Sequence, residues 1–292
     1  MEKKAHWLLK ILKLFAAIAL LALVIYKINL DSFKEAIKQL RLSTVAIILI
    51  LLFISHSINS IRIWLYIKWY LNYNIKFWDN FKLYYASLVI NNTFFGGIGG
   101  ELYKVYYLKS VKKSNVVKMI FAEKINVLAA TAFLIMACAF FLVPNAWYQL
   151  GVLMLSVIGY KIWILLECKT FNTAKLLSLL NLGIYLAVLI GFLTSFLYIT
   201  YCLRLELNMQ TIVTTSFLFL ISNIITYVPI SVGGAGLREW TFYYGAPFFQ
   251  LNVELMVMAA IIFFTCNILL SLAGVSFFVG LNRNVNHQRN KK

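Results

Sequence analysis

The chain has 292 residues, of which 62% are hydrophobic and 13% are charged, and its mean hydropathy is +0.82. Soluble domains are about half apolar and about a quarter charged, so this composition excludes a soluble globular protein. The formal net charge of +17 would suggest nucleic acid as a partner of a soluble protein. Here the basic residues lie in short segments between apolar runs, where the positive-inside rule concentrates them. We therefore predict an all-α polytopic membrane protein, 1–292 forming a single integral membrane domain, with no nucleic-acid partner.

Six apolar runs are long enough to cross a bilayer as helices, which takes about 20 residues. The first resembles a secretory signal, but no small-x-small cleavage pattern closes it before Lys27, so we expect an uncleaved helix. Residues 29–41 place apolar side chains at helical spacing among charges, which predicts a short amphipathic helix on the membrane surface. The predicted crossings are 8–27, 44–67, 119–143, 147–166, 177–201 and 253–281.

Two further apolar segments, 83–100 and 211–247, are interrupted by glycines. Broken helices at corresponding positions of two halves are typical of transporters built from inverted repeats. We therefore expect two re-entrant segments, one in a first half at about 1–118 and one in a second half at about 119–292. The second segment, 211–247, fits either a hairpin or two full crossings, since both leave its ends on the same side.

The positive-inside rule orients the chain, with both termini in the cytoplasm and the protein in the cell membrane. If 83–100 crossed the membrane fully, the lysine-rich segment 103–118 would lie outside, so a hairpin is favoured there. With that hairpin, the inside segments hold most of the 27 lysines and arginines; these segments are 1–13, 62–82, 103–118, 161–175 and 282–292.

No catalytic or metal-ligating pattern stands out in the sequence. The four cysteines, Cys138, Cys168, Cys202 and Cys266, lack metal-ligand spacing, and the three histidines are scattered. No GxxxxGK[ST] pattern indicates ATP binding. We expect no metal, no cofactor and no enzymatic activity.

Charged residues inside apolar segments mark the candidate site. In "NNTFFGGIGGELYKVYYLK" at 91–109, a glycine-rich turn opens onto a helix that begins near Glu101, with Lys104 one turn later. A flexible cytoplasmic loop followed by a helix with snorkelling lysines is the alternative. The glycines of this turn are Gly96, Gly97, Gly99 and Gly100.

Glu123 and Lys124 lie about one turn inside the predicted helix 119–143. Adjacent helical residues point about 100° apart, so the two cannot satisfy one another and each needs its own partner. A polar cavity or a contact inside the bundle would supply these partners, and snorkelling from the helix end is the alternative.

The stretch "VPISVGGAGLREW" at 228–240 breaks the second segment, and a helix is expected to start near Leu237. A helix N-terminus attracts anions, and Arg238 adds a fork that matches a phosphate. Alternatively, Arg238 pairs with a carboxylate such as Glu123 and holds the hairpin together. The other residues of interest in this stretch are Pro229, Gly233, Gly234, Gly236 and Glu239.

These three motifs together resemble the lysylphosphatidylglycerol synthase transmembrane-domain family, also called flippase-like proteins. "VPISVGGAGLREW" is similar to its proline–glycine-rich–Arg-Glu motif, "GGELYKVYYL" at 99–108 to its Gly-Glu-Leu motif, and "AEKINVLAA" at 122–130 to its Glu-Arg motif. Lys104 and Lys124 stand where the family often has arginine. We expect a stand-alone membrane domain, without the synthase domain of the best-known members.

The resemblance implies movement of a lipid between leaflets through a polar groove. Arg238, Lys104 and Lys124 would then contact the phosphate of an anionic phospholipid or a phosphate-linked glycolipid. Three carboxylates, Glu101, Glu123 and Glu239, would contact the rest of the headgroup or balance the empty site. The alternatives are a transferase or membrane component of glycolipid or surface-polysaccharide assembly, and a small-solute transporter. A homo-oligomer, or a partner synthase or transferase, is compatible with each.

The topology can be tested with single cysteines in a cysteine-free background. Because 103–118 is predicted to be cytoplasmic, Lys112→Cys should react only with a membrane-permeant thiol reagent in intact cells. Asn208→Cys is the control, since 202–210 is predicted to face outside and should also react with an impermeant reagent. Labelling of Lys112→Cys by the impermeant reagent would show that 83–100 crosses the membrane.

Overall fold

The computed structural model describes residues 41–93, 99–170, 175–226 and 236–289. Every regular element within these ranges is a helix, which confirms the all-α prediction. The predicted crossing 8–27 and nearly all of the predicted surface helix 29–41 lie outside the described residues.

The helices follow one another with short connections. In chain order they are α3 (Leu42–Leu65), η1 (Tyr66–Tyr70), α4 (Phe77–Thr93), α5 (Gly99–Tyr107), α6 (Lys113–Leu142), α7 (Ala146–Leu165), η2 (Leu166–Thr170), α8 (Lys175–Cys202), α9 (Met209–Thr226), α10 (Leu237–Gly245), η3 (Ala246–Phe249) and α11 (Val253–Arg289).

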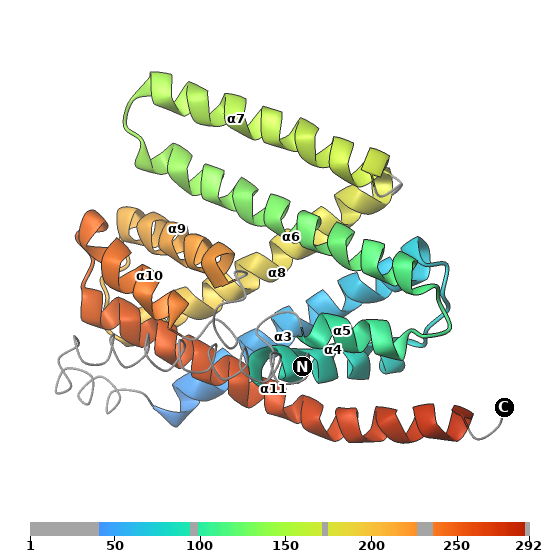
Figure 1. Cartoon of the computed structure of the whole chain (residues 1–292). Coiled ribbons are helices and arrows are strands. Elements are labelled where there is room, and N and C mark those ends of the chain that lie inside the picture. Colours follow the sequence, from blue (N-terminus) through green and yellow to red (C-terminus); the bar gives the residue numbers. More distant parts are fainter. Residues whose placement is uncertain (1–40, 94–98, 171–174, 227–235, 290–292) are drawn as a thin grey trace, which may run out of the picture.

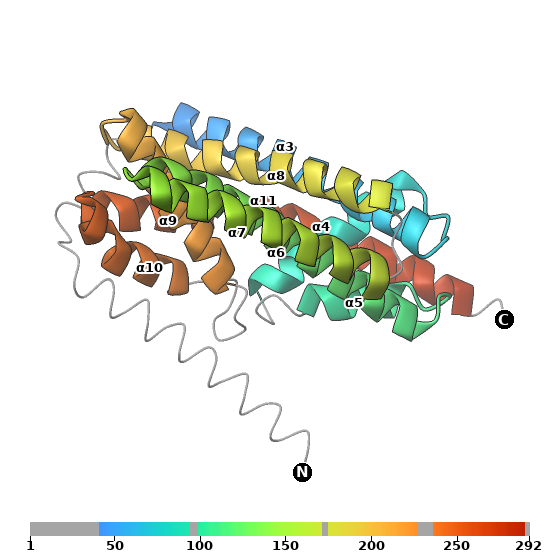
Figure 2. The ribbon, with the colours of Figure 1, turned by 90° about the horizontal axis from the view of Figure 1, so that it is seen from above.

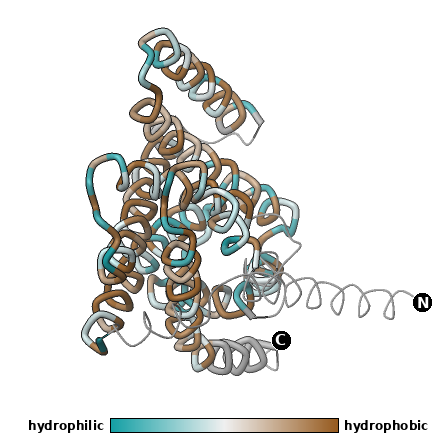
Figure 3. Tube along the Cα trace, turned by 90° about the vertical axis from the view of Figure 1, so that its left-hand side faces the viewer, coloured by the Kyte–Doolittle hydropathy of each residue, from teal (hydrophilic) through white to brown (hydrophobic). Residues whose placement is uncertain are grey.

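Six of the described helices are long and apolar enough to cross a membrane. Five of them correspond to predicted crossings, and the sixth is α9, the first arm of the broken segment 211–247. Apolar residues cover most turns of these helices, and hydrophilic residues gather largely at the connections (Figure 3). The six spans are Leu42–Tyr70, Lys113–Leu142, Ala146–Leu165, Leu177–Cys202, Met209–Thr226 and Val253–Phe277.

Aromatic packing joins the second half of the chain. The ring of Phe196 on α8 lies 4.8 Å from that of Phe219 on α9 and 5.0 Å from that of Phe242 on α10, centroid to centroid. Phe263 on α11 closes the group at 5.2 Å from Phe219. Since buried aromatic pairs of this geometry each contribute about 0.5–1.5 kcal/mol beyond the area they bury, the four rings tie the short α10 to three longer helices.

Two helical hairpins lie toward opposite ends of the bundle, and α11 packs against both (Figures 1 and 2). One consists of α4 and α5, and the other of α9 and α10. Both α5 and α10 have 9 residues, a rise of about 14 Å, which is half the hydrocarbon thickness. The helix α10 by itself is therefore too short to cross the membrane, whereas α9 is long enough to do so. Re-entry of both hairpins and their relation as inverted repeats stay predictions.

The α4–α5 hairpin depends on close approach at Gly100. A Cβ atom at this position would collide with the Ser87 carbonyl oxygen and the Asn91 side chain on α4. The Gly100 N–H donates to Asn91 Oδ1 at 2.7 Å, so the first turn of α5 is bonded to α4. A glycine is needed here because two helix backbones come within contact distance.

We predict that Gly100→Ala destabilises the protein by about 1–3 kcal/mol, because the added methyl must displace the α4 backbone. The melting temperature of the purified protein in detergent measures the effect. Gly151→Ala is the matched control: its Cβ on α7 would meet nothing within 4 Å, and alanine favours a helix. Equal melting temperatures for the two variants would contradict the tight contact between α4 and α5.

Candidate functional site

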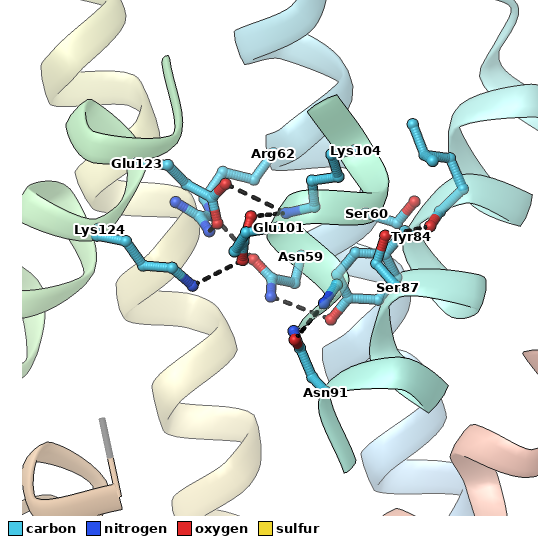
Figure 4. Close-up of polar contacts among 12 residues, drawn as sticks. Asn59, Ser60, Arg62, Tyr84, Ser87, Asn91, Glu101, Lys104, Glu123 and Lys124 are labelled. Atoms are coloured by element: carbon cyan, nitrogen blue, oxygen red, sulfur yellow. Dashed lines mark hydrogen bonds and ion pairs between the residues drawn. The ribbon is translucent and has the colours of Figure 1, made fainter. Parts of the chain in front are cut away.

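Five charged side chains meet where α3, α5 and α6 come together (Figure 4). They are Arg62 from α3, Glu101 and Lys104 from α5, and Glu123 and Lys124 from α6. We call these five residues the charge cluster.

Cations and carboxylates alternate through the charge cluster. Arg62 Nη2 donates to Glu123 Oε1 at 3.0 Å, and Lys104 Nζ donates to the other oxygen of Glu123, Oε2, at 3.4 Å. Lys104 Nζ also lies 3.0 Å from Glu101 Oε2, and Lys124 Nζ lies 2.9 Å from Glu101 Oε1. Each carboxylate therefore bridges two cations, and Lys104 links the two carboxylates.

The neighbours Glu123 and Lys124 point to different partners, as two adjacent helical residues must. Glu123 reaches α3 and α5, whereas Lys124 reaches Glu101 on α5. The motif at 122–130 and the motif at 99–108 thus both contribute side chains to the charge cluster.

Glu123 and Lys124 lie well inside α6 rather than at its end. The α6 helix begins at Lys113 and not at 119 as predicted, so Glu123 is about 15 Å along it at 1.5 Å per residue. Glu123 and Lys104 are buried, whereas the Lys124 side chain retains 35% exposure. Snorkelling is therefore wrong for Glu123 and for Lys104, and most of the turn that the alternative treats as a flexible loop lies outside the described residues.

The charges around Glu101 keep it ionised. Burial alone would raise the pKa of this carboxyl, but Lys104 and Lys124 lower the pKa to about 2. Glu101 therefore remains a carboxylate at neutral pH, and the ion pairs of α5 persist across the physiological range.

Arg62 is not among the predicted site residues, because it falls in the segment 62–82 that is predicted to be a cytoplasmic connection. In the structure the helix continues through Leu65 into η1, and Arg62 is 1% exposed. Its guanidinium lies 4.7 Å from the Tyr185 ring, and Asn59 Oδ1 accepts from its Nε at 2.8 Å. The available signal was the polar spacing of His56, Asn59 and Arg62, which repeats every third residue along an apolar helix.

The glycine-rich turns are only partly described. Gly99 and Gly100 form the first turn of α5, whereas Gly96 and Gly97 lie outside the described residues, as do Pro229, Gly233 and Gly234.

At the second break, α10 begins at Leu237 as predicted. Gly236 precedes it with φ of 83°, a left-handed conformation that favours glycine. Its N–H donates to Glu239 Oε2 at 2.6 Å, so the buried Glu239 caps its own helix. Burial raises the pKa of Glu239, although Arg238 and the Gly236 N–H oppose this. Glu239 is therefore directed toward backbone at the start of α10.

Arg238 takes no part in the ion pairs that join the five residues of the charge cluster. Its Nη2 donates to Asn223 Oδ1 on α9 at 3.2 Å, and its guanidinium lies 5.1 Å from the Phe263 ring on α11. The suggested partner Glu123 is instead bound by Arg62 and Lys104. Of the six predicted charged site residues, four thus share one cluster, and Arg238 and Glu239 form the start of α10.

The family model described as lysylphosphatidylglycerol synthase TM region matches residues 10–274, nearly the whole chain. The chain belongs to this family. No curated protein gives a significant match. Two of the family-like motifs supply four of the five residues of the charge cluster, and the described part of the third motif forms the start of α10. Within the described part of the chain, no group of three or more His, Cys, Asp or Glu residues is placed to hold a metal ion.

We predict that Glu123→Gln lowers the free energy of unfolding by about 3–5 kcal/mol, because it leaves Arg62 and Lys104 without their shared carboxylate. The double variant Arg62→Met/Glu123→Met should melt closer to the wild type, since the net charge of the cluster is unchanged and Glu101 still contacts both remaining lysines. Melting temperatures in detergent measure both variants. If Glu123→Gln melts like the wild type, the charge cluster does not hold α3, α5 and α6 together.

Proposed function

We propose that this membrane protein moves lipids with a phosphate in the headgroup from one leaflet of the cell membrane to the other, with both termini cytoplasmic. The observation that carries the proposal is the composition of the charge cluster. Three cations share two carboxylates, so the five side chains together hold one excess positive charge. An excess cation at membrane depth attracts an anion, and a lipid phosphate is the anion the bilayer itself supplies.

Two side chains of the charge cluster are already placed where they could bind a phosphate. Arg62 Nη1 is buried, and among the described residues it has no hydrogen-bond partner. A buried donor without a hydrogen-bond acceptor costs free energy, and an oxygen of an incoming phosphate would remove that cost. Lys124 is the most exposed of the three cations, so it is the first that a headgroup would meet.

We infer that binding proceeds by exchange of partners. A phosphate that reaches Lys124 competes with Glu101 for its ammonium group, and Lys104 then retains Glu101. The headgroup can next accept from Arg62 while Glu123 remains bound by Lys104. Each cation thus keeps an oxygen partner throughout, which avoids the several kcal/mol that an unsatisfied polar group costs in hydrocarbon. The lipid tails stay in the bilayer during this exchange.

Arg238 supports a second contact on the same path. Its guanidinium is on the first turn of α10, where the positive end of the helix dipole adds to its charge. The α9 helix that carries its partner Asn223 packs against α6, the helix of Glu123 and Lys124. Movement from the charge cluster to Arg238 would take a headgroup from the α4–α5 hairpin to the α9–α10 hairpin.

The test uses purified protein in liposomes that contain a trace of fluorescent phosphatidylglycerol, with leaflet exchange followed by quenching from outside. Lys124→Met should slow exchange about tenfold or more, since a hydrogen bond to a charged group contributes about 1.5–3 kcal/mol. Lys161→Met is the matched control, because Lys161 is exposed on α7, away from the charge cluster.

Parallel arms separate the alternatives. Vesicles loaded with labelled solutes test a small-solute transporter, and a sugar-loaded polyprenyl phosphate with an acceptor tests a transferase. The proposed function would be rejected if the wild type moved no labelled lipid between leaflets. It would also be rejected if Lys124→Met and Lys161→Met exchanged the lipid at equal rates.

A further inference from the structure

A chain of hydrogen bonds runs from α11 to the charge cluster. It links Asn267 on α11, His56 on α3, Tyr84 on α4, and Asn59 and Arg62 on α3. We call these five residues the histidine chain. His56 lies midway along the span Leu42–Tyr70, so the chain starts near the centre of the membrane.

The donors of the chain can be assigned from its two ends. The Asn267 amide nitrogen donates to the Phe263 carbonyl oxygen at 2.9 Å, so Oδ1 is the atom that faces His56 Nε2, at 3.0 Å. His56 Nε2 must therefore carry a hydrogen. In a neutral imidazole the other nitrogen is an acceptor, so Nδ1 accepts the hydroxyl proton of Tyr84 at 2.8 Å.

The assignment continues without conflict to the charge cluster. The Tyr84 oxygen accepts from Asn59 Nδ2 at 3.1 Å, and Asn59 Oδ1 accepts from Arg62 Nε at 2.8 Å (Figure 4). All bonds between Arg62 and His56 thus point in one direction. The geometry describes the state in which His56 is neutral.

His56 is buried among uncharged side chains that come from three other helices. From α4 it meets the Tyr84 and Tyr85 rings, from α8 the Phe192 ring, and from α11 Asn267. The charged group reached through the chain is Arg62, on its own helix, and Glu123 follows it. Histidine is the side chain that ordinarily gains or loses a proton between about pH 5 and pH 8, and ionisable residues at membrane depth often mark proton pathways.

A proton on His56 would reverse the chain. Both nitrogens of an imidazolium are donors, so Nδ1 would donate to the Tyr84 oxygen and the Tyr84 hydroxyl would need a new acceptor. Asn59 can offer Oδ1 only if its amide turns over. Its NH₂ group would then face Arg62 Nε, donor against donor, and Arg62 would lose this contact with α3. Protonation therefore adds a positive charge and frees Arg62 to move toward an anion.

We propose that His56 is a proton-binding site through which a proton and an anionic lipid headgroup cross the membrane together. The inference rests on the proposed function, since it assigns the coupling ion of that lipid movement. One proton offsets the single negative charge of a phosphodiester, so the loaded site carries no additional net charge through the bilayer. The proton comes from the aqueous phase on one side and returns to water on the other.

Transport supplies the first test. Purified protein is placed in phosphatidylcholine vesicles with a trace of fluorescent phosphatidylglycerol and a pH gradient of one unit, acid outside. With one proton per lipid, the labelled lipid should become enriched in the inner leaflet up to about tenfold over its distribution without a gradient, since one pH unit is a tenfold ratio of protons. A protonophore should abolish this enrichment.

His56→Gln should exchange the lipid without responding to the gradient, and Tyr84→Phe should do the same because it removes the hydroxyl that links His56 to Asn59. His287→Gln is the matched control and should respond like the wild type. Enrichment that survives the protonophore, or that persists in both His56→Gln and Tyr84→Phe, would overturn the proposal while the lipid movement itself stands.

Proton binding is tested separately, without any lipid movement. Nitrogen NMR of a His6→Gln/His287→Gln protein leaves His56 as the single histidine. At about pH 8 the spectrum should show a neutral ring with hydrogen on Nε2, and lowering the pH toward about 4 should produce an imidazolium. A ring that remains neutral over this range would overturn the proton site, and a wild type that titrates but moves no lipid would reject the proposed function alone.

Discussion

The bridge from Glu123 to both Arg62 and Lys104 is the interaction on which the arrangement of the helices depends. A charge at the centre of a membrane helix costs about 2.5–3.5 kcal/mol on insertion scales and less near a helix end, so each of these residues is costly to bury alone. Paired, they require α3, α5 and α6 to come within a hydrogen bond of one another. Removing one partner would leave a buried charge, so the pairing constrains all three helices at once.

This requirement explains the close packing of the α4–α5 hairpin. For Lys104 and Glu101 to reach α6, the short α5 must be held at a fixed depth, and the Gly100 bond to Asn91 on α4 does this. The α4 helix is in turn packed on α11, where Gly274 comes so close to the Tyr85 carbonyl oxygen that a Cβ would collide with it. Two glycines thus transmit the position of α11 to the charge cluster.

The charge cluster and the histidine chain share Arg62, and this gives the molecule one connected polar path through an apolar interior. One side of Arg62 is bound by a carboxylate and the other by a neutral amide. In the proposed transport, the ion pairs exchange partners with a phosphate and the bonds of the histidine chain reverse when one proton is added. The two changes meet at a single guanidinium.

Composition and local pattern determined the class of protein, five of the crossings within the described residues, and the three motifs that contain charges in apolar surroundings. These features are local, because apolar length and a misplaced charge can be read within one segment. The membership of Arg62 in the site could not be read this way. It lies near the end of an apolar run, where a buried arginine and the first residue of a loop look alike. The helix continues past it because Tyr66 and Ile67 are buried by other helices.

Partner choice was also decided by tertiary structure. The sequence indicated that Glu123 and Lys124 need different partners, but the partners come from Arg62 and Glu101, which are far away along the chain. The sequence left Glu123 open as an alternative partner of Arg238, whereas the packing of α9 against α10 brings Asn223 to its guanidinium. Spacing along one helix determines which residues share a face, whereas the neighbour of that face depends on how all the helices pack.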